Sequence, residues 1–141
     1  MKSVNPYLNF DGNAEEAFNF YKSIFWWEFM MLQRFKDTPE GEKLSDSDKE
    51  KLMHVSLPIW KSNVLMATDA LESMWMKLIW GNNFYLALEA DTKEEADKVF
   101  SWLSAWWNVE MAMQDQFWGE YFWMLKDRFW INWMVSYAYP K

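Results

Sequence analysis

The single histidine of the chain, His54, is the residue best suited to acid-base chemistry. It lies in the segment 53–59, where apolar and polar residues alternate with the two-residue period of a strand, and Ser56 falls on the same side. An imidazole there can act as a general base or as a polar anchor for a ligand. The sequence places no carboxylate or nucleophile beside it to form a triad, so a hydrogen-bonded structural histidine is the competing interpretation.

The strand expected at residues 4–10 offers two further polar side chains. Its apolar residues face one side, and Tyr7 and Asn9 face the other. If this strand neighbours the strand of His54, a phenol and an amide can add hydrogen bonds to the same ligand. Glu89 is the only acidic residue on a strand face expected to line a cavity, and an exposed charge at the end of a strand is the simpler interpretation.

The strand with Tyr7 opens a unit that occurs twice in the chain. Residues 5–27 and residues 83–107 align so that Glu15-Glu16-Ala17 falls over Glu94-Glu95-Ala96. In both copies a short alternating strand precedes an amphipathic helix, and Trp-Trp follows the helix. This repetition indicates that one structural module is used twice.

The segments that follow each helix predict three further strands, so each module is predicted to be β-α-β-β-β. The predicted fold class is therefore α+β. We expect a single domain with a first module at residues 1–70, a linker at 71–82 and a second module at 83–141. In the second module, Tyr85 faces away from the helix side of its strand.

The segment from Lys36 to Lys51 is mixed in charge and nearly free of large apolar side chains. We interpret it as a solvated loop with one helical turn after Ser45. Asp46 and Asp48 lack the spaced ligands and the central glycine of a calcium-binding loop, so that alternative is discarded.

Composition excludes several classes of function. The net charge of −7 and the scattered Lys and Arg residues argue against a nucleic-acid partner or an anionic membrane. The chain has no cysteine, which excludes disulfides, thiolate metal sites and a thiol nucleophile. The N-terminus has no apolar signal region, and no apolar run is long enough to span a bilayer, so we expect a soluble cytoplasmic protein.

Tryptophan stands at unusual places in the chain. The sequence contains 12 Trp beside only 4 Gly. Trp26-Trp27 and Trp106-Trp107 follow the helices, where a glycine C-cap is usual, and Trp130 stands where a strand begins. Because an indole side chain is poorly suited to positive φ, these positions indicate a deliberately altered sequence.

Taken together, these motifs resemble the vicinal-oxygen-chelate superfamily, known for glyoxalases and bleomycin-resistance proteins. More narrowly, the chain resembles the PhnB-like branch, whose members are often labelled demethylubiquinone methyltransferases. The resemblance covers nearly the whole chain and is carried by the segments 5–13, 15–17, 20–22, 54–57, 117–119, 127–129 and 132–135.

The resemblance implies paired βαβββ modules, each curling its strands around a cavity, in a homodimer. It also implies that Trp26-Trp27, Trp60, Trp75, Trp106-Trp107, Trp123 and Trp130 stand at family glycines, whereas Trp118 and Trp133 look native. The candidate ligand-binding residues are accordingly Tyr7, Asn9, His54, Ser56, Tyr85, Trp118 and Trp133.

Metal-dependent members of the superfamily place His and Glu at cavity-facing strand positions, because a divalent ion needs several hard ligands that converge. The residues near those positions here are Asn5 or Tyr7, Val64 or Met66, Tyr85, and Met134. None of these is a good ligand, so we expect neither a metal nor another cofactor.

The leading hypothesis is a homodimeric, engineered PhnB-like protein that binds a small apolar or aromatic molecule without being an enzyme. One alternative is a metal-dependent lyase or isomerase of the superfamily. The other is a designed scaffold with no ligand, altered for packing or assembly.

Overall fold

The computed structural model describes residues 1–74, 77–105 and 119–141, and the backbone of residues 108–115. It divides into two compact units, Met1–Ile79 and Trp80–Lys141, and each is described by itself. Among the described residues, no helix combines the length and the apolar character needed to cross a membrane.

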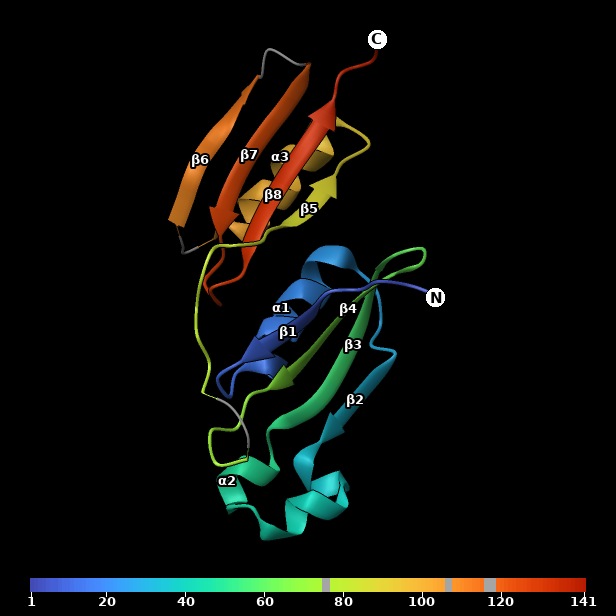
Figure 1. Ribbon diagram of the computed structural model, residues 1–141. Helices are drawn as coiled ribbons and strands as arrows, with labels where there is room; N and C mark the ends of the chain where they lie inside the picture. Colours follow the sequence, from blue (N-terminus) through green and yellow to red (C-terminus); the bar gives the residue numbers. More distant parts are fainter. Residues whose placement is uncertain (75–76, 106–107, 116–118) are drawn as a thin grey trace. The chain divides into compact units, whose positions relative to one another are not determined.

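The first unit is a four-stranded sheet with one helix on it (Figure 1). The strands lie in the order β1-β4-β3-β2, and β1 runs parallel to β4 while the other pairs are antiparallel. Its main elements are β1 (Tyr7–Phe10), α1 (Ala14–Phe25), β2 (Met31–Arg34), β3 (Leu52–Trp60) and β4 (Asn63–Asp69).

Helix α1 forms because its apolar residues recur at helical spacing and its first turn carries Glu15 and Glu16, which favour a helix N-terminus. Its buried stripe consists of Ala14, Ala17, Phe18, Tyr21 and Ile24. This stripe packs on the sheet face that carries Leu8, Phe10, Val55, Leu57, Leu65 and Ala67, all of them buried. The opposite face of the sheet is left without a helix of its own unit (Figure 1).

Asp69, at the end of β4, ties three elements of this unit together. Its Oδ1 accepts a hydrogen bond from the backbone N–H of Ala14 at 2.9 Å, and its Oδ2 accepts one from Leu52 at 2.8 Å. Asn13, which the sequence suggested as the N-cap of α1, makes no side-chain capping bond, and its Oδ1 is buried without a partner among the described residues. A carboxylate 55 residues away therefore satisfies the start of the helix.

The segment between β2 and β3 is more ordered than a plain loop. It forms two short 3₁₀ helices, η1 (Phe35–Asp37) and η2 (Pro39–Lys43), and the single-turn helix α2 (Asp46–Lys49). Ser45 caps α2 by accepting the N–H of Asp48 at 3.1 Å, where the sequence predicted the helical turn.

The second unit repeats the first. It consists of β5 (Leu86–Glu89), α3 (Lys93–Leu103), β6 (Asn108–Asp115), β7 (Glu120–Lys126) and β8 (Asn132–Ala138). Its sheet has the order β5-β8-β7-β6, with β5 parallel to β8. Each unit is thus one β-α-β-β-β module, which confirms the predicted α+β fold of two modules.

Two tryptophans occupy the left-handed region of the backbone. Trp26 ends α1 with a φ of 63°, and its N–H donates to the carbonyl of Lys22 at 2.9 Å; Trp130 has a φ of 71°. Glycine adopts this conformation without the steric penalty that an L-residue meets there. Trp75, Trp106 and Trp107 lie outside the described residues.

Candidate functional site

The face of the first sheet opposite α1, which we call the first open face, carries the polar residues that the sequence singled out. Strand register places side chains of all four strands on it. Its members are Tyr7 and Asn9 from β1, Met31 and Gln33 from β2, His54, Ser56 and Pro58 from β3, and Val64, Met66 and Thr68 from β4.

Tyr7 and His54 contact each other on this face. The Tyr7 hydroxyl lies 3.2 Å from Nδ1 of His54, and the ring centroids are 5.7 Å apart. The two strands are not neighbours, because β4 lies between them. The long phenol side chain spans this strand diagonally, so two residues 47 positions apart in the chain meet.

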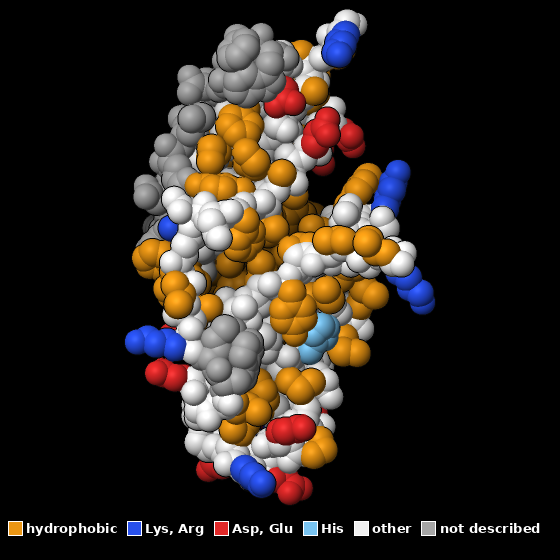
Figure 2. Space-filling view, viewed as in Figure 1, with side chains coloured by type: hydrophobic (Ala, Val, Ile, Leu, Met, Phe, Trp, Pro, Cys, Tyr) orange, Lys and Arg blue, Asp and Glu red, His pale blue; other side chains and the backbone are white. Residues whose placement is uncertain are grey.

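Partial burial raises the pKa of the Tyr7 phenol above its ordinary value of 10.0. The phenol therefore keeps its proton at neutral pH. His54 is half-buried, and the pale blue histidine in Figure 2 lies at the surface beside hydrophobic side chains.

Other polar groups on the first open face have no side-chain hydrogen bond within the described part of the chain. These are Asn9, Gln33 and Ser56. Thr68 differs, since its hydroxyl donates to the carbonyl of Leu52 at 3.3 Å. Gln33 was missed from the sequence, although it alternates with the apolar Leu32 and is the β-partner of His54.

The first open face carries no carboxylate. The charged residues nearest to it in the strands, Arg34 and Asp69, turn to the side of α1, where Arg34 pairs with Glu15 and Asp69 accepts backbone N–H groups. Although the chain has a net charge of −7, the described side chains of this face carry no negative charge.

The corresponding face of the second sheet, which we call the second open face, has a different chemistry. Its members are Ala87 and Glu89 from β5, Glu120, Phe122, Met124 and Lys126 from β7, and Met134, Ser136 and Ala138 from β8. Tyr85 directly precedes β5 on the same side and is half-buried. Glu89 is exposed at the end of its strand.

Two residues of the expected ligand set do not join these faces. Trp133 pairs with Leu86 on the helix-covered side of the second sheet, where it is 0% exposed, and its indole N–H donates to Asp127 at 2.8 Å. It belongs to the core, so we leave it out of the proposed site. Trp118 lies outside the described residues.

The strand positions that the resemblance to the superfamily implies for metal ligands do not fit a metal here. The residues near those positions are Asn5 or Tyr7, Val64 or Met66, Tyr85, and Met134, and their amide, phenol, alkyl and thioether groups do not make a ligand set for a hard divalent ion. Among the residues that the structure describes, no three His, Cys, Asp or Glu side chains come together in a metal-binding group.

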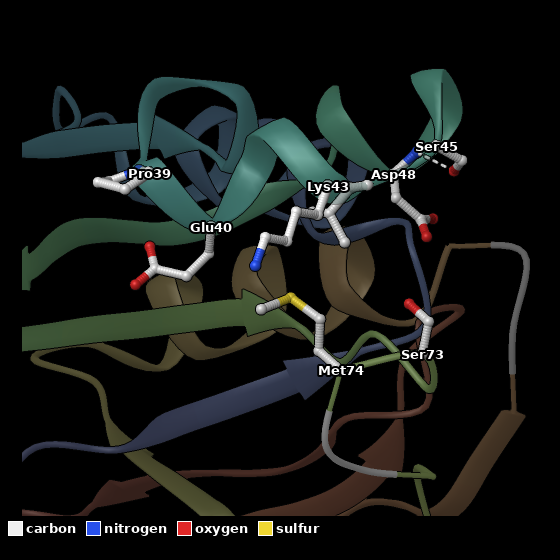
Figure 3. Close-up of a pocket in the computed structure, with 8 residues that line it drawn as sticks. Pro39, Glu40, Lys43, Ser45, Asp48, Ser73 and Met74 are labelled. Carbon is white, nitrogen blue, oxygen red and sulfur yellow. Dashed lines mark hydrogen bonds between the residues drawn. The ribbon is translucent and has the colours of Figure 1, made fainter.

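A groove of about 620 Å³ lies elsewhere in the first unit, between the segment with η2 and α2 and the turn after β4 (Figure 3). The amine of Lys43 points into it opposite Met74, and Glu40 and Asp48 add carboxylates. Asp48 is already engaged with Lys51 at 3.0 Å. The other two charged side chains, Glu40 and Lys43, are exposed to solvent, and the candidate site is therefore the first open face.

Comparison with known proteins gives one family. The family model described as 3-demethylubiquinone-9 3-methyltransferase matches residues 2–136. Protein YjdN of Escherichia coli (strain K12) is 27% identical over 141 residues, covering 94% of this chain and 93% of its own length.

Solved structures agree with this match. Protein PA1353 from Pseudomonas aeruginosa superimposes with a TM-score of 0.83 at 33% identity, covering 96% of this chain and 97% of that one. A putative 3-demethylubiquinone-9 3-methyltransferase, the PhnB protein from Bacillus cereus, gives a TM-score of 0.79 at 23% identity, covering 96% and 99%.

A glyoxalase/bleomycin resistance protein/dioxygenase family enzyme from Burkholderia phytofirmans PsJN has the same fold. Its TM-score is 0.62 at 19% identity, with 96% of this chain and 100% of that chain covered.

Proposed function

The chain belongs to the 3-demethylubiquinone-9 3-methyltransferase (PhnB-like) family and has the glyoxalase fold, and from that premise we propose that it binds a small apolar or aromatic molecule on the first open face. The observation that carries this proposal is the Tyr7–His54 contact on a face whose other polar side chains are unengaged. Polar groups of this kind orient a ligand that apolar contacts hold.

The apolar part of the site consists of flexible side chains. Met31 is 52% exposed and Met66 is half-buried, and both lie in the same cross-strand row as Tyr7 and Ser56. Thioether side chains adapt to varied shapes and make favourable contacts with aromatic rings. A planar molecule lying on this row would touch both methionines and the phenol ring.

The binding role needs no metal. Tyr7 and Met66 occupy strand positions where a metal-dependent lyase or isomerase needs carboxylate or imidazole groups. The residues of the first open face instead supply hydrogen bonds, through an imidazole, a phenol and amides.

We further propose that the protein is a homodimer and that its sequence is an engineered variant. Exposed Met31 and Leu32 on the edge strand β2, and Met30 just before it, supply apolar surface for a partner. Trp26 and Trp130 stand in backbone conformations suited to glycine, which supports substitution at those positions. Light scattering after gel filtration measures the molar mass in solution. The mass of a monomer would contradict the homodimer proposal.

The binding proposal is tested by titrating the isotope-labelled protein with 2-naphthol and following backbone amide shifts. We expect saturable shifts in β1, β3 and β4 around Tyr7, Asn9 and His54. The His54→Ala variant should weaken binding by about tenfold, the effect of losing one hydrogen bond to a bound polar group. The matched control is Asn19→Ala on the exposed side of α1, which should bind as before. Shifts confined to the second unit, or none at all, would contradict the proposal.

A further inference from the structure

Building on the proposed function, we infer that the first open face selects apolar molecules that carry a carboxylate, and that Nε2–H of His54 is the group that donates to it. The inference rests on the Tyr7–His54 geometry and on the charges around it. It specifies the class of ligand, which the proposed function leaves open.

The contact with the Tyr7 hydroxyl is the ground on which the ring proton of His54 is assigned. With the phenol protonated, the inferred arrangement of this 3.2 Å contact is Tyr7 O–H donating to Nδ1 of a neutral imidazole, which leaves the ring proton on Nε2. If the imidazole is charged, both nitrogens carry protons and Nδ1–H donates to the phenol oxygen instead. In both of these arrangements Nε2 is a donor.

This donor is available. Within the described residues, the structure records no hydrogen bond from His54 other than the one to Tyr7. His54 is half-buried, so part of its ring reaches solvent at the open face. A donor in such a position matches an oxygen acceptor on the ligand, whereas an ammonium group has only donors and cannot accept from it.

A carboxylate has a second oxygen, and the neighbouring side chains can serve it. Gln33 is the β-partner of His54 across β2 and β3, and Ser56 follows two residues along β3 on the same face. The amide of Gln33 and the hydroxyl of Ser56 are donors without recorded partners in the described structure. Hydrogen bonds from several donors to one anion are stronger than those to a neutral acceptor.

The charges around the site favour an anion as well. No carboxylate lies on the first open face, and the nearest strand carboxylate, Asp69, is directed to the backbone N–H groups of Ala14 and Leu52 on the other side. The remaining titratable group that faces His54 is Tyr7, which is neutral when protonated. A ligand carboxylate would therefore meet donors without a like charge beside them.

The first experiment reads the tautomer directly. Because His54 is the only histidine, the long-range nitrogen–proton spectrum of uniformly labelled protein contains one imidazole pattern. At a pH where the ring is neutral, we expect the Nε2–H pattern, and Tyr7→Phe should give a mixture of both tautomers. A spectrum showing Nδ1–H in the unaltered protein would overturn the inference.

The second experiment compares two probes of similar size, 2-naphthoate and 2-naphthylmethylamine, by calorimetric titration at neutral pH. We expect 2-naphthoate to bind at least about tenfold more tightly, as charge-assisted hydrogen bonds require. His54→Gln, whose amide nitrogen can reach near the Nε2 position, should retain much of this preference. His54→Asn, whose amide reaches only the Nδ1 position, should lose it, and Asn19→Ala serves as the control.

The outcomes separate the inference from the proposed function. If neither 2-naphthol nor either charged probe binds, the proposed function falls and this inference falls with it. If 2-naphthol binds but the amine binds as tightly as the carboxylate, the carboxylate preference alone is overturned. Equal affinity of His54→Asn and the unaltered protein for 2-naphthoate would also overturn the carboxylate preference. Thermal melts of each variant check that the fold persists.

Discussion

The two modules share one strand order but use their buried aspartates in different ways. Asp69 joins the end of β4 to the start of α1 and the start of β3, through the N–H groups of Ala14 and Leu52. Asp127 closes its own turn, accepting from Phe129 at 2.8 Å and Ile131 at 3.1 Å, and also holds the indole of Trp133. The repeat thus preserves the topology, while the polar contacts that stabilise each module have diverged.

The open faces differ in the same way. Among the described strand residues, the first presents Tyr7 and His54 and no carboxylate, whereas the second presents Glu89 and Lys126. Residues on an uncovered sheet face contribute little to the core, so they can change without loss of the fold. This comparison indicates that a ligand site in one module need not have a counterpart in the other.

The largest effect is expected from removing the buried aspartates. Asp69→Ala leaves two buried N–H groups without an acceptor, so the first unit should lose about 3 kcal/mol or more of stability. Asp127→Ala should destabilise the second unit by a similar amount. Residue-resolved hydrogen exchange under native conditions separates the units, and equal loss of protection in both units from either variant would break the comparison.

A carboxylate introduced on the first open face should remove its preference for anions. In Gln33→Glu, the β-partner of His54 becomes a negative charge of almost the same shape, and affinity for 2-naphthoate should fall by about tenfold. Glu89→Gln removes a charge from the second open face and should leave that affinity unchanged. Calorimetric titration measures both, and a loss with Glu89→Gln instead would assign the site to the other module.

Replacing a tryptophan by glycine should stabilise the chain only where the backbone is left-handed. Trp26→Gly relieves a φ of 63° at the end of α1, and we expect a gain of about 1 kcal/mol in the free energy of unfolding. Trp27 has no positive φ, so Trp27→Gly should give no gain. Urea denaturation checks the pair, and equal effects would mean that the indoles, not the backbone, determine stability.

The same test in the second unit should give a smaller gain. Trp130 also has positive φ, but its ring contacts Trp80 at 6.0 Å between centroids and lies under the amine of Lys126 at 5.5 Å. Trp130→Gly removes these contacts together with the strain. Its gain in urea denaturation should therefore be below that of Trp26→Gly, and a larger gain would contradict this account.

The smallest effect concerns pH. Burial raises the pKa of the Asp69 carboxyl above 3.8, and the hydrogen bonds from Leu52 and Ala14 only partly oppose it. A carboxyl with a raised folded pKa contributes stability below its unfolded pKa and loses it as pH rises through the folded value. From pH 3.5 upward, the free energy of unfolding of the first unit should fall as pH rises, and Asp69→Asn should remove this pH dependence. An unchanged slope in Asp69→Asn would contradict the assignment.

Much of the candidate site could be predicted from alternation along the strands. Tyr7 and Asn9 were assigned to one face of β1, and His54 and Ser56 to one face of β3, and the structure places all four on the first open face. Trp133 was named from the sequence as a ligand-binding residue, and the structure places it in the core, where its indole N–H donates to Asp127. The N-terminus of α1 likewise uses Asp69 in place of Asn13.

The sequence by itself determined the duplicated modules, their strands and helices, and the side of each strand on which a residue lies. These are local properties, since side-chain direction along a strand follows from its period of two and helix formation from nearby residues. Only the tertiary structure decided that β4 lies between β1 and β3, that Tyr7 reaches His54 across it, and that Asp69 joins α1 to β3. Those contacts join residues distant in the chain, and they depend on strand order and register, which no local pattern encodes.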